Sequence, residues 1–223
     1  MGVFRILNLY ACLGGNRYKW DEVAKEAGIE IQVTAVELDP ELARMYQERF
    51  PNDIVIVTDA HQYLLDRYKE FDFVWTSPPC PSHSKARFWG SKGGKCNVIY
   101  PDMTLYQEII LLQNFYNGQF CVENVDAYYD PLIQSKKRGR HLYWTNFNLP
   151  NILSKRIDVA KNRGKNELLD LCNFHDINLQ EYSGEQSKVK IARNLVDFEA
   201  GKTILETALN ITKQNNTKQT SLF

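Results

Sequence analysis

The chain has 223 residues, 43% of them hydrophobic, and its 27 basic and 27 acidic side chains give a formal net charge of zero. This length suits one domain of generous size, and the composition excludes a mostly disordered chain. No run approaches the roughly 18 apolar residues of a transmembrane helix, and a neutral chain has no bulk attraction to polyanions.

The five cysteines are odd in number and scattered, and no two of them form a CxxC pair. This pattern supports neither a disulfide framework nor a zinc site, so we expect free thiols and no bound metal. The N-terminus enters a strand-like segment at once rather than a signal peptide, which predicts a cytoplasmic protein that is not secreted and has no membrane partner.

Apolar strand-like runs alternate with helix-like stretches along the first half of the chain. We predict strands over 3–9, 31–37, 54–58 and 71–76, with helices over 17–28, 40–50 and 60–69 between them. A helix over 101–116, strands over 119–123 and 141–145 and a helix over 196–209 follow, before a flexible polar tail over 213–223. This alternation predicts an α/β fold with a mostly parallel central sheet and helices on both faces.

Three consecutive strand ends carry residues suited to a nucleoside. The first predicted strand runs into Tyr10-Ala11-Cys12 and then Gly14-Gly15, where small residues let a ligand approach the backbone amides. The next two end in Glu37-Leu38 and Asp59-Ala60. A carboxylate at a strand end can hold ribose hydroxyls, although either acid can instead cap the following helix. Because neither a GxGxxG nor a Walker lysine motif is present, S-adenosylmethionine is favoured over NAD and ATP.

Cys80 follows Pro78-Pro79 at the end of the apolar strand over 71–76. Ligands of open α/β sheets bind outside the carboxyl ends of the strands, so this thiol is placed like a nucleophile on a stiff turn. The competing interpretation is a packing cysteine, since free cysteines are mostly buried.

Glu123 closes the strand over 119–123 and is predicted to reach the same sheet edge as Cys80. A buried carboxyl is costly unless it is used or paired, although a purely structural role stays open. Carbon methylation of cytosine needs this pair of groups. A thiolate adds to C6 while an acid assists at N3, and C5 then becomes nucleophilic enough to accept a methyl group. The base must be flipped out of a duplex or presented single-stranded.

Two segments are basic although the chain is neutral. Residues 77–100 contain no acid, and the nine basic residues of 135–165 face only Asp158. Such loops indicate a local anionic ligand, with solvated lysine-rich loops as the alternative. The candidate nucleic-acid contacts are Ser84, Lys85, Arg87, Lys92, Lys95, Lys136, Lys137 and Arg156.

In their order these motifs resemble the cytosine-C5 DNA methyltransferase family, over about residues 4–145 and 188–209. The stretch 8–15 is similar to that family's first cofactor motif, with Asn8 in place of an acid and Cys12 in place of a glycine. The resemblance implies a Rossmann-like methyltransferase fold with S-adenosyl-L-methionine as cofactor. It also implies that Glu37 binds the ribose and Asp59 contacts the adenine.

The catalytic motifs of the family have counterparts farther along the chain. Pro79-Cys80 followed by Ser84 resembles the catalytic loop, and residues 123–125 resemble the ENV motif. Arg138-Gly139-Arg140 resembles the end of the QxRxR motif, which implies that Arg140 bonds the cytosine O2 or the catalytic glutamate. We also expect these two arginines to lower the pKa of Cys80. Asn194 and Val196 resemble the final GNxV motif that returns to the cofactor, with Arg193 in place of the glycine.

The resemblance divides the chain into a catalytic and cofactor-binding core (1–145), a reduced target-recognition segment (146–187) and a C-terminal strand and helix returning to the core (188–212). Family members usually insert a substantial recognition domain where this chain has about 40 residues. We therefore expect a short target site, a strand-state preference or a protein partner that supplies specificity.

The predicted activity is methyl transfer from S-adenosylmethionine to cytosine C5 in DNA, either a duplex with a flipped cytosine or a single strand. Three alternatives stay open at this stage. In the first, the substrate is RNA or a free cytosine nucleotide. In the second, the chain is a non-catalytic cofactor- or nucleic-acid-binding subunit. In the third, the chain methylates an exocyclic amino group. The retained Cys80 and Glu123 argue against the last two.

Overall fold

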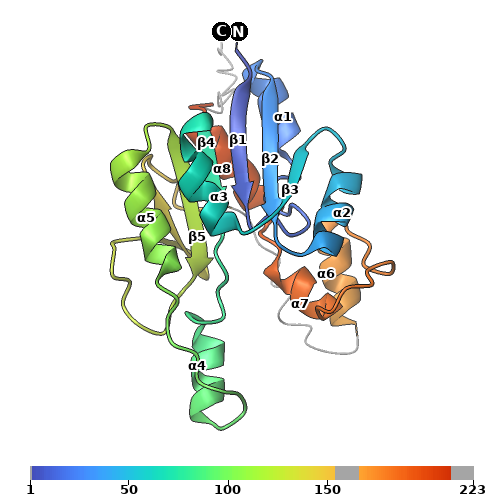
Figure 1. Cartoon of the computed structure of the whole chain (residues 1–223), viewed down its shortest axis with the longest axis vertical. Coiled ribbons are helices and arrows are strands. Elements are labelled where there is room, and N and C mark those ends of the chain that lie inside the picture. Colours follow the sequence, from blue (N-terminus) through green and yellow to red (C-terminus); the bar gives the residue numbers. More distant parts are fainter. Residues whose placement is uncertain (1, 154–165, 212–223) are drawn as a thin grey trace, which may run out of the picture.

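The computed structural model describes residues 2–153 and 166–211, and within them a seven-stranded sheet forms the centre of the molecule (Figure 1). The strands are β1 (Phe4–Leu9), β2 (Ile31–Glu37), β3 (Ile54–Val57), β4 (Phe73–Thr76), β5 (Gln119–Val125), β6 (Lys136–Arg138) and β7 (His141–Thr145). Their order across the sheet is β3-β2-β1-β4-β5-β7-β6. Strands β1 to β5 are parallel, and β7 lies antiparallel between β5 and β6. The predicted α/β class with a mostly parallel sheet is confirmed.

Helices cover both faces of this sheet. Successive side chains of a strand point to opposite faces, and both faces of the buried strands are apolar. The helices are α1 (Trp20–Ala27), α2 (Pro40–Arg49), α3 (Ala60–Arg67), α4 (Lys85–Lys92), α5 (Thr104–Phe115), α6 (Glu167–His175), α7 (Lys188–Asn194) and α8 (Phe198–Ala208), with a short 3₁₀ turn, η1 (Tyr68–Glu70). Leu7 and Val74 pack with α3 and α5 on one face, whereas Ile6 and Phe73 pack with α1 and α8 on the other.

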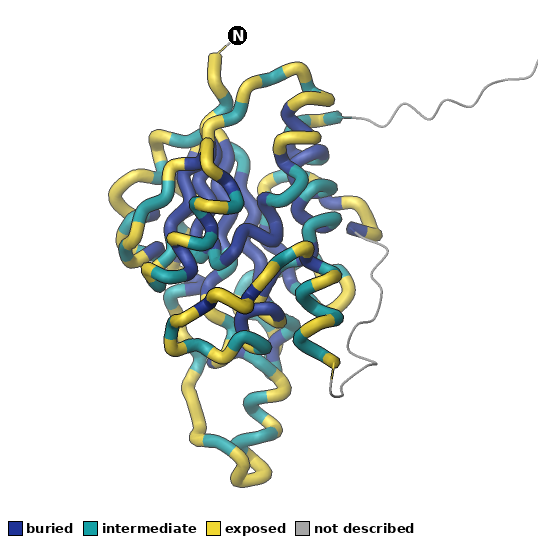
Figure 2. Tube along the Cα trace, turned by 90° about the vertical axis from the view of Figure 1, so that its right-hand side faces the viewer, coloured by how far each residue is buried: buried dark blue, intermediate teal, exposed yellow. Residues whose placement is uncertain are grey.

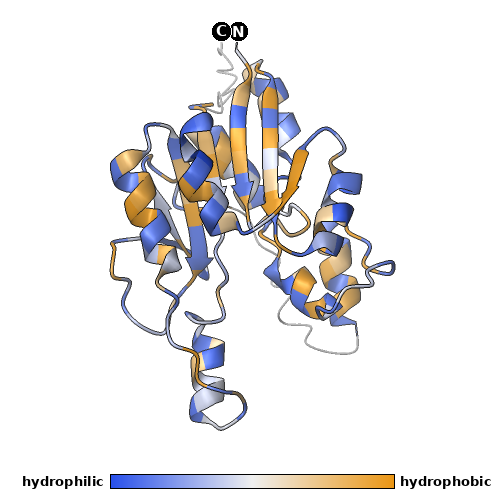
Figure 3. Ribbon diagram, in the orientation of Figure 1, coloured by the Kyte–Doolittle hydropathy of each residue, from blue (hydrophilic) through white to orange (hydrophobic). Residues whose placement is uncertain are grey.

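The sheet and the arm formed by α4 and the loop after it, which we call the α4 arm (85–100), differ in hydropathy. Orange, hydrophobic positions dominate β2 and β3 in Figure 3, whereas α4 is drawn mainly in blue and pale colours. None of the residues of α4 is buried, and the helix projects away from the sheet. No helix in the described part of the chain is long and apolar enough to cross a membrane.

The predicted strands and the predicted helices of the core are present, with ends shifted by a few residues. Helix α4, strand β6 and helix α6 were not predicted. The strand expected at the start of 188–212 is wrong, because 188–194 forms helix α7. Ile191, Ala192 and Leu195 recur at helical spacing and pack against Leu13 and Leu42. A helix buries all three on one side, whereas a strand would point neighbouring residues to opposite sides. The predicted tail over 213–223 lies outside the described residues.

Candidate active site

The loop after β1 is a tight turn in which the amides of Ala11, Cys12 and Gly14 are bonded within the protein. Tyr10, Cys12 and Gly14 have φ angles of 55°, 47° and 67°. The Ala11 amide donates to the Val36 carbonyl at 3.0 Å, and that of Gly14 to the Ala11 carbonyl at 2.8 Å. These two amides and that of Cys12 thus have partners within the protein, and the contact of this loop with a cofactor stays a prediction. The left-handed φ at Cys12 also shows why a glycine is usual there, since a side chain costs about 1–2 kcal/mol in this conformation.

Glu37 connects the ends of β1 and β2 through its carboxylate. One oxygen accepts the Cys12 amide at 2.8 Å, and the other accepts the Asp39 amide at 3.0 Å. Burial raises the pKa of Glu37, while these backbone hydrogen bonds oppose that rise. Each oxygen has a further lone pair for a ligand hydroxyl. Beside it, Leu38 is 66% exposed and offers an apolar surface at the same edge of the sheet.

Asp59, at the end of β3, has a structural role that uses only one of its two carboxylate oxygens. Asp59 caps α3, because one of its oxygens accepts the Gln62 amide at 2.7 Å. The helix-cap alternative is thus realised, while the side chain stays exposed to solvent at the sheet edge. Ala60 is buried in the core, so only its backbone can face a ligand.

The C-terminal segment packs directly on the loop after β1. A Cβ atom added at Gly15 would lie 2.4 Å from the Val196 carbonyl oxygen, and one at Gly201 would lie 2.2 Å from the Asn16 carbonyl oxygen. Glycine is required at both positions because backbone occupies the space. The predicted return of Val196 to the cofactor loop is therefore present, with Asn194 exposed at the end of α7.

These strand ends fit an adenosine-bearing ligand better than a phosphate-bearing one. A carboxylate with free lone pairs suits ribose hydroxyls, and an exposed leucine suits the face of a base. A phosphate-binding loop would instead present free amides, and the amides of Ala11, Cys12 and Gly14 are bonded internally.

The turn that carries Cys80 is held to the end of β5. The Cys80 carbonyl accepts the amides of His83 at 3.0 Å and Ser84 at 3.1 Å, which closes the turn. The Asn124 side chain donates to the Pro78 carbonyl at 3.0 Å. Pro79 is exposed beside the thiol. The ends of β4 and β5 are thus joined through buried Asn124, as parallel neighbouring strands predict.

The charge of Glu123 reaches Cys80. Glu123 is buried at the end of β5, and its carboxylate, together with burial as the larger cause, raises the pKa of the Cys80 thiol. Lys190 of α7 opposes this rise. This opposing charge comes from a lysine 110 positions along the chain, and the expected effect of Arg138 and Arg140 on the Cys80 pKa stays a prediction.

Two side chains of β6 are bonded to the end of β7 and the segment that follows it. The Arg138 guanidinium donates to the carbonyls of Pro150 at 2.5 Å and Leu149 at 3.1 Å, so it anchors the following segment and does not reach Glu123. The Lys136 ammonium donates to the Thr145 hydroxyl at 2.9 Å and to the Phe147 carbonyl. Backbone carbonyls thus engage both cations, and the catalytic role of Arg138 and the nucleic-acid contact of Lys136 stay predictions. The role of Arg140 stays a prediction.

His141 is a site residue that sequence reasoning missed. Its Nε2 atom lies 3.6 Å from an oxygen of Glu123, and it pairs with Val125 in the antiparallel register of β7 and β5. A histidine next to an arginine pair was a weak signal, because its proximity to Glu123 depends on the antiparallel return of β7.

Glu108 was also missed, although it is the single carboxylate within 104–115, the apolar part of the helix predicted over 101–116, and this was a usable signal. It is 0% exposed. It accepts hydrogen bonds from Tyr10 at 2.7 Å and Thr76 at 2.6 Å, and His61 lies 3.2 Å away. The hydrogen bond to Glu108 raises the pKa of His61, and burial and this carboxylate raise the pKa of Tyr10 far above its ordinary value. The network fixes Tyr10 beside the turn.

Some of the residues predicted to contact phosphate are paired with an acid, and others are exposed to solvent. Lys85 and Lys137 both bind Asp126, at 2.7 Å and 2.6 Å, which brings the two basic segments together but neutralises part of their charge. Ser84 forms an isolated bridge with Ala127. Lys92 and Lys95 are exposed and Arg87 is half-buried on the α4 arm. Arg156 lies outside the described residues.

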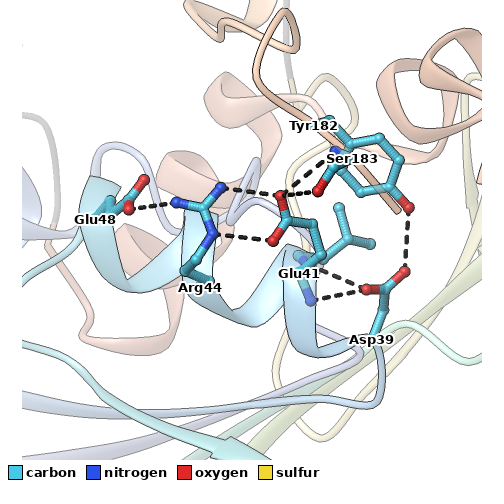
Figure 4. Close-up of polar contacts among 7 residues, drawn as sticks. Asp39, Glu41, Arg44, Glu48, Tyr182 and Ser183 are labelled. Atoms are coloured by element: carbon cyan, nitrogen blue, oxygen red, sulfur yellow. Dashed lines mark hydrogen bonds and ion pairs between the residues drawn. The ribbon is translucent and has the colours of Figure 1, made fainter. Parts of the chain in front are cut away.

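Residues 166–187 of the short segment 146–187 pack against α2. Figure 4 shows Tyr182 and Ser183 directed at Asp39 and Glu41, with Tyr182 3.2 Å from Asp39 and the Ser183 hydroxyl 3.1 Å from Glu41. Arg193, which stands where the resemblance predicts glycine, forms a bidentate pair with Glu167 of α6 at 2.6 Å and 2.7 Å. That substitution therefore binds α7 to α6.

Comparison with known proteins points in the same direction as this geometry. The model of the C-5 cytosine-specific DNA methylase family matches residues 4–142. The methyltransferase EhMeth of Entamoeba histolytica is 9% identical with a TM-score of 0.54, over 95% of this chain and 99% of that one. A DNMT2 mutant of Spodoptera frugiperda is 13% identical with a TM-score of 0.55, over 92% and 99%. No match was found among curated proteins. The two structures share a Rossmann-like methyltransferase fold with this chain.

Proposed function

Because the chain belongs to the C-5 cytosine-specific DNA methylase family, we propose that it transfers a methyl group from S-adenosylmethionine to C5 of cytosine in DNA. The observation that carries this proposal is the coupling of Cys80 and Glu123. Asn124 links their two strand ends, and the Glu123 charge acts on the thiol.

The proposed chemistry begins at Cys80. Its thiolate adds to cytosine C6 while Glu123 gives or shares a proton at N3, so C5 becomes nucleophilic and takes the methyl group as the bond between the methyl carbon and the cofactor sulfur breaks, with the electron pair staying on sulfur. Loss of the C5 proton then expels the thiolate from C6, and return of the N3 proton to Glu123 restores the aromatic ring. Burial and the Glu123 carboxylate raise the pKa of the Cys80 thiol, and a hydrogen bond from Glu123 to the base would disperse that carboxylate charge.

The cofactor supplies an electrophilic methyl group. Glu37 would hold its ribose hydroxyls, Leu38 and Asp59 would lie at the adenine, and Pro79 would separate it from the target base. The internally bonded loop of Tyr10 to Gly15 gives this pocket its shape, and the contact of Gly15 with Val196 closes it from the C-terminal side.

An RNA substrate is the second candidate. It is favoured by one observation: residues 166–187 dock on α2, so the described chain offers little beyond the α4 arm to read a long duplex sequence. DNA remains the first choice because the family model that matches is one of DNA methylases. Recognition would then rest on Arg87, Lys92 and Lys95, with a protein partner supplying further specificity.

Incubation of the purified chain with labelled S-adenosylmethionine and cytosine-containing duplex DNA, single-stranded DNA or RNA tests the proposal. Mass spectrometry of the isolated bases identifies the product. We expect 5-methylcytosine from the wild type and none from Cys80→Ala, whose cofactor affinity should be unchanged. Transfer by Cys80→Ala, or a methyl group on the exocyclic nitrogen, would refute the covalent mechanism. Cofactor binding without transfer to any substrate would favour a binding subunit.

A further inference from the structure

Beside the Cys80 turn, the α4 arm forms a groove that the proposed chemistry does not use. We call it the α4 groove, a cavity of about 260 Å³. Its wall includes Ser84, Arg87, Phe88, Lys92, Tyr100 and Tyr128, and neither Cys80 nor Glu123 lines it. The volume lies just below the range of about 300–1,000 Å³ of ordinary ligand pockets, which suits one small unit of a larger ligand.

One wall of the α4 groove is aromatic. The rings of Phe88 and Tyr128 stack with centroids 4.2 Å apart and planes 5° apart. Tyr100 is 83% exposed at the rim, and Trp89 is 68% exposed on the same arm. Aromatic faces presented to solvent are stacking platforms for unpaired bases, and they are out of reach for bases already stacked inside a duplex.

The charge in the α4 groove is positive. The Nε atom of Arg87 is buried and has no hydrogen-bond partner. The Lys92 ammonium lies 5.6 Å from the centre of the Phe88 ring. The nearby acids are engaged elsewhere, since Asp126 binds two lysines and Asp102 accepts the Thr104 amide at 3.0 Å. Two cations beside aromatic faces form the donor set that binds a nucleotide through its phosphate and its base.

The arm is built to present these groups rather than to pack. Figure 2 draws the projecting part in teal and yellow, without a buried stretch. The arm is nevertheless ordered by its own contacts, because the Gly93 and Lys95 amides donate to the carbonyls of Trp89 and Gly90, and the Cys96 thiol lies 3.6 Å from the Arg87 carbonyl. A folded arm with an exposed aromatic and cationic surface indicates a binding role.

From these observations we infer that the α4 groove binds an unpaired nucleotide next to the target cytosine, so that the enzyme prefers a single-stranded or looped-out stretch of DNA or RNA over a continuous duplex. This inference rests on the proposed function. Pro81 and Ser82, which directly follow Cys80, line the groove together with Ser84, whose amide is bonded to the Cys80 carbonyl, so we place the nucleotide held there next to the one at the thiol.

Binding of fluorescent oligonucleotides that contain one cytosine tests the inference, with single-stranded DNA, RNA of the same sequence and duplex DNA as three separate probes. The variants are Tyr100→Ala and Lys92→Ala. The matched controls are Phe115→Ala, an aromatic residue that is 63% exposed, and Lys69→Ala, whose ammonium lies 5.5 Å from the Tyr68 ring. Both controls lie outside the α4 arm.

We expect Tyr100→Ala to weaken single-strand binding about 5-fold to 100-fold, the range for loss of one stacked base. Lys92→Ala should weaken binding of both single-stranded probes. The slope of log affinity against log salt concentration should become less steep by the amount expected for about one lost phosphate contact. The controls should bind like the wild type. If the substitutions weaken binding of the DNA and RNA probes equally, the groove recognises the base and the phosphate, which both probes share, and not the sugar. Stronger wild-type binding to the duplex, or equal affinities of variants and controls, would overturn the inference.

Methyl transfer measured on the same samples separates this inference from the proposed function. If the groove variants lose affinity while the wild type methylates nothing, the proposed function fails and the nucleotide site stands. If the wild type methylates cytosine and the groove variants keep the wild-type KM for single strands, the site fails and the proposed function stands. Unchanged unfolding temperatures show that the variants are folded.

Discussion

The two halves of the functional edge of the sheet are built in opposite ways. At the ends of β1 and β2 the loop amides are bonded internally, Glu37 joins the strands, and Val196 packs against Gly15 without room for a methyl group. At the ends of β4 and β5 the Cys80 turn continues into an arm without buried residues. Under the proposed function, the first, closed half would hold a small ligand of constant shape, whereas the second, open half would receive a polymer. A substitution should therefore affect stability in the closed half and substrate use in the open half.

The largest effect that tests this contrast is expected for Glu123→Gln. An amide cannot give a proton to N3, so methyl transfer should fall about 100-fold to 10,000-fold, the usual contribution of a general acid. Cofactor affinity should not change because Glu123 lies in the open half. Single-turnover transfer and cofactor titration by calorimetry measure the two quantities. A parallel loss of cofactor affinity would show that the halves are not separable.

Gly15→Ala tests the closed half. The new methyl group would meet the Val196 carbonyl oxygen at 2.4 Å, and neither backbone can move freely. We expect a loss of about 1–3 kcal/mol in the free energy of unfolding, typical of overpacking, together with weaker cofactor binding. Gly93→Ala in the arm is the matched control, because its methyl group would meet nothing closer than 3.5 Å. Equal stability of the two variants in urea unfolding would contradict the contrast.

The pH dependence of Cys80 alkylation tests the charge on the open half. Burial and Glu123 raise the thiol pKa, so the thiol form dominates near neutral pH and the reactive thiolate grows as pH rises. Alkylation by iodoacetamide should still be accelerating at about pH 9, above the ordinary cysteine pKa of about 8.5. Removal of the opposing charge by Lys190→Ala should shift the curve to higher pH. Peptide mass spectrometry isolates Cys80 from the other thiols, and a plateau below pH 8 would refute the assignment.

Arg193→Ala should have the smallest effect. The pair with Glu167 is bidentate but exposed on the arginine side, and such surface pairs contribute about 0–1 kcal/mol. Thermal unfolding should drop slightly, and oligonucleotide binding should not change because α6 and α7 lie on the α2 side of the molecule (Figure 1). Loss of substrate binding in this variant would place the 166–187 segment in recognition and break the division between the halves.

Local sequence patterns were sufficient for the fold class, the order of the core strands along the chain and the choice of the two side chains that we propose to be reactive. Apolar alternation sets strands and helices locally, and parallel strands carry their ends to one edge of the sheet. The amino-acid sequence alone therefore pairs Cys80 with Glu123. The Pro-Cys turn and the ENV motif were sufficient for the family, because each motif lies within a single strand end.

Contacts between distant segments account for what these patterns could not predict. Lys136 and Arg138 stand in a motif that predicts catalysis, yet the carbonyls they reach belong to a segment whose path no local pattern encodes. Lys190 acts on a thiol 110 residues away, and His141 meets Glu123 only because β7 runs antiparallel to β5. Spacing along a chain constrains a backbone over a few residues, whereas the direction of a charged side chain is set by whichever partner the fold brings within reach.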